Sequence, residues 1–198
     1  CKRGHNFEDV KKASKLIRRY RFTLGHQMMV GLPESSALDD LNTAKDLIKL
    51  KPKIVRIYPV LVIKGTELEK EMNNGKYEPL SVEQAVERCK EIMYLFNKKK
   101  IKVIRIGLQS TDTICSPDKE TSEVVGGPYH ETFRQLVEAS IYYDYIIDKI
   151  KNFNMNVKEV LIRVNPQDVN NVVGHKKENI TKIKEVYDVN AKIEQDIK

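Results

Sequence analysis

Cysteine and histidine are the residue types that most often carry metal or covalent chemistry, and neither type is clustered in this sequence. Cys1, Cys89 and Cys115 are too far apart for a disulfide framework or a zinc site. The histidines also lack a partner at metal-ligand spacing, so we expect a structural or surface role for each of them: His5, His26, His130 and His175. The sequence therefore predicts no metal site in this chain and identifies no catalytic residue.

A series of short motifs in the first 130 residues carries more information than any single residue. They read Lys2-Arg3-Gly4-His5, His26-Gln27-Met28-Met29-Val30-Gly31-Leu32-Pro33, Arg56-Ile57-Tyr58-Pro59-Val60, Lys64-Gly65-Thr66-Glu67-Leu68, Arg105-Ile106-Gly107-Leu108-Gln109 and Val125-Gly126-Gly127-Pro128-Tyr129-His130. In order and spacing they resemble the radical S-adenosylmethionine (SAM) proteins, in the branch related to the catalytic subunit of Elongator. The resemblance covers roughly residues 1–150.

This resemblance implies a partial (β/α) barrel in which SAM lies across the carboxyl ends of parallel strands, as ligands do in complete barrels. It also implies a [4Fe–4S] cluster held by three thiolates of a CxxxCxxC motif. Cys1, Cys89 and Cys115 do not have that spacing. We therefore expect the chain to be the C-terminal part of such an enzyme, without the cluster ligands and inactive on its own.

The resemblance also assigns five residues to SAM. Arg3 matches the arginine that faces the SAM carboxylate, a group that a guanidinium fork binds well; the alternative is a surface arginine before a helix. Gln27 matches a polar residue on the ribose hydroxyls, and a polar side chain on an otherwise buried strand needs a partner; the alternative is a bond to a neighbouring strand. Gly31, Ile57 and Tyr58 are expected to border the adenine, or else to be ordinary core residues.

The tail carries a second motif. It consists of a strand, a helix, a basic turn that begins with glycine, a second helix and a strand, at Val160–Val164, Asp168–Val173, Gly174–Lys177, Asn179–Tyr187 and Ala191–Glu194. This order resembles the KH motif, whose GXXG loop between two helices holds RNA. The resemblance predicts RNA contacts at Gly174, Lys176 and Lys177, although Lys177 stands where the motif has glycine. The alternative is a small α/β cap without RNA affinity.

The elements that must position these residues alternate in type. Capping residues precede helical apolar repeats after Asn6, Ser36 and Ser81. Strands that are apolar on both faces are expected at 22–30, 53–60 and 101–108, and 109–128 is expected to be a loop. The alternation predicts an α/β fold with parallel strands, namely the C-terminal half of a radical SAM barrel followed by a KH-like module. The predicted domains are 1–153 and 154–198.

Composition adds expectations about partners. The net charge of +7 and the pI near 9.1 favour an anionic partner such as RNA. The sequence has no signal peptide and no apolar run of the roughly 18 residues that a membrane helix needs, so we expect a cytoplasmic protein without a membrane partner. Half a barrel would also leave a sheet edge uncovered, which predicts a homodimer through that edge.

Together these patterns favour an enzyme. In its full-length form it would cleave SAM reductively to a 5′-deoxyadenosyl radical and act on tRNA. The acetyltransferase domain that often ends Elongator-like proteins is not expected, because the tail is too short. The alternative is a non-catalytic RNA-binding or adaptor protein built from half a barrel and a KH-like tail.

Overall fold

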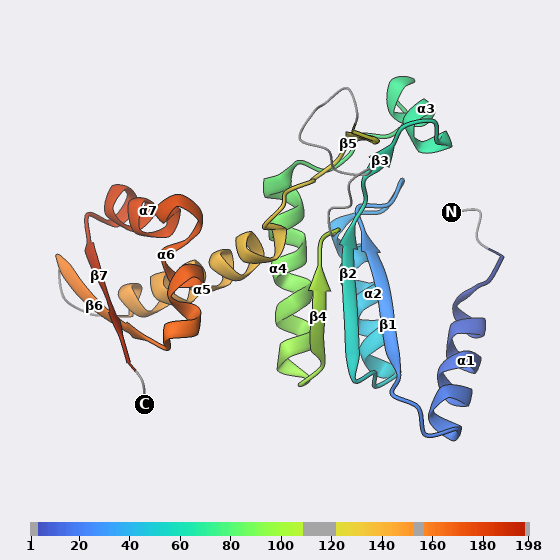
Figure 1. The fold of residues 1–198 in the computed structure, drawn as a ribbon, viewed down its shortest axis with the longest axis horizontal. Helices are drawn as coiled ribbons and strands as arrows, with labels where there is room; N and C mark the ends of the chain where they lie inside the picture. Colours follow the sequence, from blue (N-terminus) through green and yellow to red (C-terminus); the bar gives the residue numbers. More distant parts are fainter. Residues whose placement is uncertain (1–3, 109–121, 153–156, 197–198) are drawn as a thin grey trace. The chain divides into compact units, whose positions relative to one another are not determined.

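The structure, a computed structural model, describes residues 4–108, 122–152 and 157–196 (Figure 1). The chain forms two compact units, Cys1–Glu131 and Thr132–Lys198. Both units combine helices with parallel strands, and the predicted α/β fold is confirmed. Each unit is described by itself below.

The first unit is built on a parallel sheet with the strand order β1-β2-β4 (Figure 1). Its strands are β1 (Gly25–Val30), β2 (Ile54–Pro59) and β4 (Lys102–Ile106), and both strand pairs are parallel. Helix α2 (Ala37–Lys49) connects β1 to β2, and α4 (Val82–Lys98) precedes β4. The predicted βα alternation is therefore present.

The helices of this unit begin where the sequence predicts. Asn6 caps α1 (Phe7–Arg19), Ser36 caps α2 and Ser81 caps α4, each through a capping box. In a capping box two orphan N–H groups at the helix start are satisfied reciprocally. The three helix starts are therefore determined by local sequence.

Only one face of the sheet is apolar. Met28, Ile57 and Ile106 are buried on that face, together with residues of α2 and α4 such as Leu47 and Ile92. On the other face, Gln27 pairs with Arg56, and Arg56 pairs with Arg105. Gln27 and Arg56 are exposed and Arg105 is half-buried. The expectation of strands apolar on both faces is wrong for the described sheet, because these polar side chains interrupt the second face.

A short antiparallel pair lies beyond the parallel sheet. Strand β3 (Val62–Ile63) pairs with β5 (Val124–Gly126), and α3 (Glu67–Asn73) follows β3. The sequence predicted only loop over 109–128. Strand β5 is too short for an alternating apolar pattern, and its pairing with β3 depends on residues about 60 positions earlier in the chain.

The second unit packs helices on a pair of parallel strands. Its elements are α5 (Phe133–Lys151), β6 (Glu159–Val164), α6 (Val169–Val173), α7 (Glu178–Tyr187) and β7 (Asn190–Gln195), with short 3₁₀ turns at Pro166–Asp168 and His175–Lys177. Ile146 and Ile147 of α5 share one core with Val172, Ile183 and Val189. This unit therefore begins about twenty residues before the predicted boundary at 153/154, because α5 contributes its apolar face to the second core.

Candidate functional site

The register of β1 and β2 places two of the predicted SAM residues on one face of the sheet. Gln27 pairs with Arg56, and Met29 pairs with Tyr58. Since side chains alternate along a strand, Gln27 and Tyr58 point to the same side. Gln27 is exposed and Tyr58 is half-buried. The premise that Gln27 lies on a buried strand face and needs a partner there is therefore wrong, whereas its accessibility to a ligand is clear.

Two other predicted adenine neighbours, Ile57 and Gly31, have structural roles in this unit. Ile57 is fully buried and pairs with Met28 on the face packed against the helices, opposite Gln27. Gly31 has a φ of +79°, and a Cβ at this position would lie 2.6 Å from Cδ1 of Leu80. Gly31 is therefore required by backbone conformation and close packing. Arg3 lies outside the described residues.

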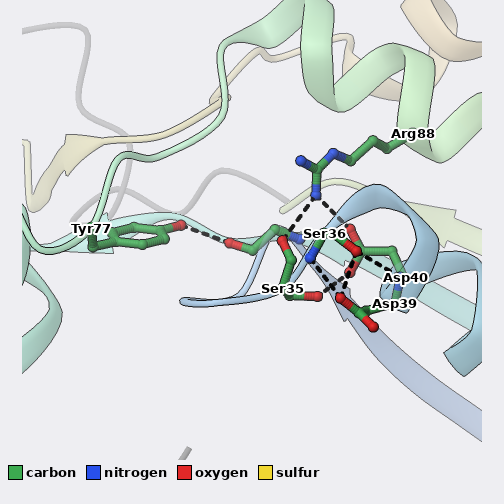
Figure 2. Close-up of polar contacts among 7 residues, drawn as sticks. Ser35, Ser36, Asp39, Asp40, Tyr77 and Arg88 are labelled. Atoms are coloured by element: carbon green, nitrogen blue, oxygen red, sulfur yellow. Dashed lines mark hydrogen bonds and ion pairs between the residues drawn. The ribbon is translucent and has the colours of Figure 1, made fainter.

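A polar network holds the turn that follows β1 (Figure 2). Oδ2 of Asp40 accepts hydrogen bonds from the Gly31 amide at 3.2 Å and from Nη1 of Arg88 at 2.9 Å. Oδ1 of Asp40 accepts from the Ser35 hydroxyl at 3.1 Å. The Tyr77 hydroxyl donates to the Gly31 carbonyl at 2.8 Å. Both backbone polar groups of Gly31 are thus satisfied by side chains from other elements.

The Asp40–Arg88 pair is the most buried ion pair recorded among the described residues. The side chain of Asp40 is 3% exposed and that of Arg88 is 23% exposed. Burial raises the pKa of Tyr77 above its usual value, so this hydroxyl keeps its proton and remains a donor. The sequence did not predict this network. Asp40 follows a capping residue, but nothing in the local pattern indicates Arg88, which lies 48 residues away.

A hollow of about 530 Å³ borders the outer edge of β1 and includes Gln27. His26 also lines it, with Nε2 lying 3.3 Å from the Ser14 hydroxyl of α1. Burial, and then the charge of Arg18, lower the pKa of His26 below 6.5. His26 is therefore neutral near pH 7. The hollow is lined by both polar and apolar side chains, as a nucleoside site requires.

Cys89 is not available as a metal ligand. Its side chain is fully buried in α4, and burial raises the pKa of its thiol to about 12. Iron–sulfur clusters are held by thiolates, and a thiol with this pKa stays protonated. Cys1 and Cys115 lie outside the described residues. Within the part of the chain that the structure describes, no group of three potential metal-ligating side chains is present.

The basic turn of the tail lies between α6 and α7, as predicted. Lys176 and Lys177 are exposed and have left-handed φ values of 49° and 67°. Lys177 therefore adopts the conformation that glycine favours at the last position of a GXXG loop. Gly174 is buried, with a φ of 82°, and a Cβ there would lie 2.9 Å from the Asn179 amide nitrogen. The prediction of RNA contact at Gly174 itself is weakened by this burial, and its evident role is to shape the turn.

The buried side chain of Asn179 stabilises this turn. Its Nδ2 donates to the carbonyls of Ala139 at 2.9 Å, Val172 at 3.1 Å and Asn171 at 3.3 Å. The residue is 5% exposed, so α5 and α6 are tied to the start of α7 by one buried amide. Sequence reasoning missed this role, because an asparagine near a helix start is usually an exposed cap.

Part of the chain matches a known protein family. The Radical_SAM C-terminal domain family matches residues 52–143. This stretch begins just before β2 and ends within α5. Over this stretch the chain is therefore similar to the C-terminal region of radical SAM proteins.

The similar proteins point to one branch of that class. Over 90 residues the chain is 39% identical to the tRNA uridine(34) acetyltransferase of Methanocaldococcus jannaschii and 38% identical to that of Methanocaldococcus infernus. Each match covers 44% of this chain and 17% of the relative. A solved structure of Methanocaldococcus infernus Elp3 with an N-terminal deletion is 30% identical, with a TM-score of 0.60, over 75% of this chain and 32% of that one. The predicted likeness to the Elongator-like branch of the radical SAM proteins is confirmed.

The chain spans only a small part of the curated relatives. The matched region is about a sixth of the length of each of them. In the described residues, no helix is both long enough and apolar enough to cross a bilayer.

Proposed function

We propose that the first unit supplies the SAM-facing strands of a radical SAM enzyme and that the second unit contacts the RNA substrate, which is a tRNA. One observation carries the first part. The parallel sheet leaves a polar face that brings Gln27 and Tyr58 together, in a chain similar to Elp3 over three quarters of its length. The names of the curated relatives support tRNA as the substrate class.

The residues on this face suit a nucleoside. The Gln27 amide offers donors and an acceptor to ribose hydroxyls, and its exposure leaves it accessible. The half-buried ring of Tyr58 offers a flat surface against which adenine can pack. Arg3 would bind the SAM carboxylate through its guanidinium fork. Ile57 is not part of this set, because it lies on the opposite face.

The cluster and SAM, when bound, supply the radical chemistry, in which a 5′-deoxyadenosyl radical abstracts a hydrogen atom from the substrate. The residues of this chain bind and orient SAM. The Asp40–Arg88 network holds the turn after β1 in one position, and Gln27 and Tyr58 hold the nucleoside against the sheet. Cys89 does not fit a cluster ligand, so the thiolates must come from outside the described residues.

Anaerobic calorimetric titration of SAM into the intact, full-length enzyme tests this proposal. Arg3→Ala should weaken SAM binding by about 1.5–3 kcal/mol, the range for a charge-assisted hydrogen bond. Gln27→Ala should cost less, about 1 kcal/mol, because its partners are neutral hydroxyls. Ile57→Val, on the opposite face of the same sheet, is the control and should leave the affinity unchanged. An unchanged affinity in the Arg3 variant would reject the assignment.

The RNA contact is proposed at Lys176 and Lys177. Two amides of the turn are already engaged, since Gly174 N donates to Asn170 O and Lys177 N donates to Gly174 O. The exposed lysines therefore carry more of the phosphate binding than the backbone does. Binding should be weak, little dependent on sequence and strongly dependent on salt.

Anisotropy titration of labelled tRNA at two salt concentrations measures this contact. Changing both Lys176 and Lys177 to aspartate should abolish binding without unfolding the unit, because exposed loop residues contribute little to stability. The matched control changes Lys98 and Lys99 at the exposed end of α4 to aspartate, which alters the net charge equally. Equal binding by wild type and the loop variant would exclude this turn as the contact.

A non-catalytic RNA-binding or adaptor protein is the second candidate. The observation that favours it is the exposed turn with Lys176 and Lys177, which could bind RNA without a cluster. The two measurements separate the candidates. An adaptor binds tRNA through the lysine turn and does not bind SAM.

A further inference from the structure

Among the described residues, the backbone groups on one edge of strand β6 have no strand partner. Asn190 N donates to Lys158 O at 2.9 Å and Asp196 N donates to Val164 O at 2.8 Å. Carbonyls of even-numbered residues therefore point toward β7, and because direction alternates along a strand, those of Glu159, Leu161 and Arg163 point to the opposite edge. Among the described strands β6 pairs only with β7. The row on the other edge is free to pair with a further strand.

An apolar hollow of about 450 Å³ lies along the same strand, with α5 as its other wall. Tyr142, Ile146 and Ile150 of α5 face it, as do Val160 and Ile162 of β6. Because β6 and α5 line the same hollow, a strand added at the outer edge of β6 would lie beside it.

We infer that β6 and α5 form a docking groove for an extended peptide strand of a partner polypeptide, which joins the sheet by pairing with Glu159, Leu161 and Arg163. A two-stranded sheet is marginal, and a third strand would complete it. Main-chain pairing would supply affinity, and the hollow would select the side chains on one face of the strand.

The lining defines the chemistry of the peptide. Its inward positions must be apolar, since Ile146, Ile150 and Val160 form the floor and wall. Lys149 and Arg163 line the rim, and Arg163 is already paired with Glu194 at 2.7 Å. The exposed Lys149 is therefore the cation that faces a partner, and Asp168 is the carboxylate of the lining. The partner strand should therefore alternate apolar residues with polar ones and place an acidic residue beside Lys149. Leu161 (55% exposed) and Tyr145 (60% exposed) would be covered by it.

A proline substitution gives a selective test. The N–H of residue 161 points away from β7, so Leu161→Pro removes one outward donor without breaking the β6–β7 ladder, as proline on an edge strand permits. Leu161→Thr changes the same side chain and keeps the donor. The probe is a displayed library of random heptapeptides, selected on the whole protein, followed by anisotropy of the best labelled peptide.

We expect enrichment of peptides that alternate apolar residues and contain Asp or Glu. Leu161→Pro should weaken binding of the best peptide by about tenfold or more, because it removes a hydrogen bond and blocks the ladder. Leu161→Thr should bind the same peptide within about threefold of wild type. Circular dichroism verifies the fold of both variants. Absence of enrichment, or equal binding by the proline variant, would overturn the inference. Displacement of the peptide by a uridine-rich RNA oligonucleotide at micromolar concentration would assign the groove to RNA and also overturn it.

Discussion

Each unit holds a turn with one buried polar side chain, which is a hydrogen-bond acceptor in the first unit and a donor in the second. In each, a glycine with positive φ begins a turn, Gly31 at 79° and Gly174 at 82°, and a buried polar side chain holds that turn. In the first unit Asp40 accepts hydrogen bonds from Gly31, Ser35 and Arg88. In the second unit Asn179 donates to carbonyls of α5 and α6.

The difference follows from which backbone groups each turn exposes. A strand that ends at the carboxyl edge of a sheet leaves an N–H group without a partner, so an acceptor is needed, and Arg88 then balances its charge. The end of α6 leaves the carbonyls of Asn171 and Val172 without helical partners, so a donor is needed. A carboxylate suits the first turn and a neutral amide suits the second. Substitutions at these two residues test whether this distinction holds.

The largest effect is expected at Asp40. Asp40→Ala leaves Arg88 without its buried partner and the Gly31 amide without an acceptor, and should lower the free energy of unfolding by about 3 kcal/mol. Asp46→Ala on the same helix removes only an exposed pair with Lys49 and should cost about 0.5 kcal/mol or less. Urea unfolding of both variants gives the comparison. A loss at Asp40 as small as the loss at Asp46 would contradict a structural role for the network.

A smaller effect is expected at Asn179. Asn179→Ala removes one side chain that serves several carbonyls and should cost about 2 kcal/mol, from leaving buried acceptors unsatisfied. Asn170→Ala, an exposed position on α6, is the control and should be neutral within about 0.5 kcal/mol. The loss should appear in the unfolding transition of the second unit. A loss confined to the first unit would contradict the assignment.

The smallest effect is expected at Asp188. Hydrogen bonds from Lys158 and Lys184 lower the pKa of Asp188 from 3.8 to about 2. Because the folded-state pKa is depressed, the stabilisation is present above pH 4 and is lost as the pH falls toward 2. Asp188→Asn should flatten this acid dependence of the melting temperature, whereas Glu185→Gln on the same helix should not. An equal acid dependence in wild type and Asp188→Asn would show that these exposed pairs contribute nothing measurable.

Local sequence predicted the parts of this structure that depend on local physics. The capping boxes at Ser36 and Ser81 and the alternation of strands with helices were confirmed because they depend on neighbouring residues. The contribution of α5 to the second core and the β3–β5 pair required contacts between distant positions. The same holds for the site: Gln27 and Tyr58 came from a family motif, whereas Arg88 and Asn179 act through contacts that no short motif encodes.

The division of labour between the two units is the central claim, and one paired measurement tests it most directly. SAM affinity and tRNA affinity are each measured in Arg3→Ala and in the variant with Lys176 and Lys177 changed to aspartate. Arg3→Ala is expected to weaken SAM binding by about 1.5–3 kcal/mol and to leave tRNA binding intact. The lysine variant is expected to lose tRNA binding and to bind SAM normally. Loss of both ligands in either variant, or of neither ligand in both, would contradict it.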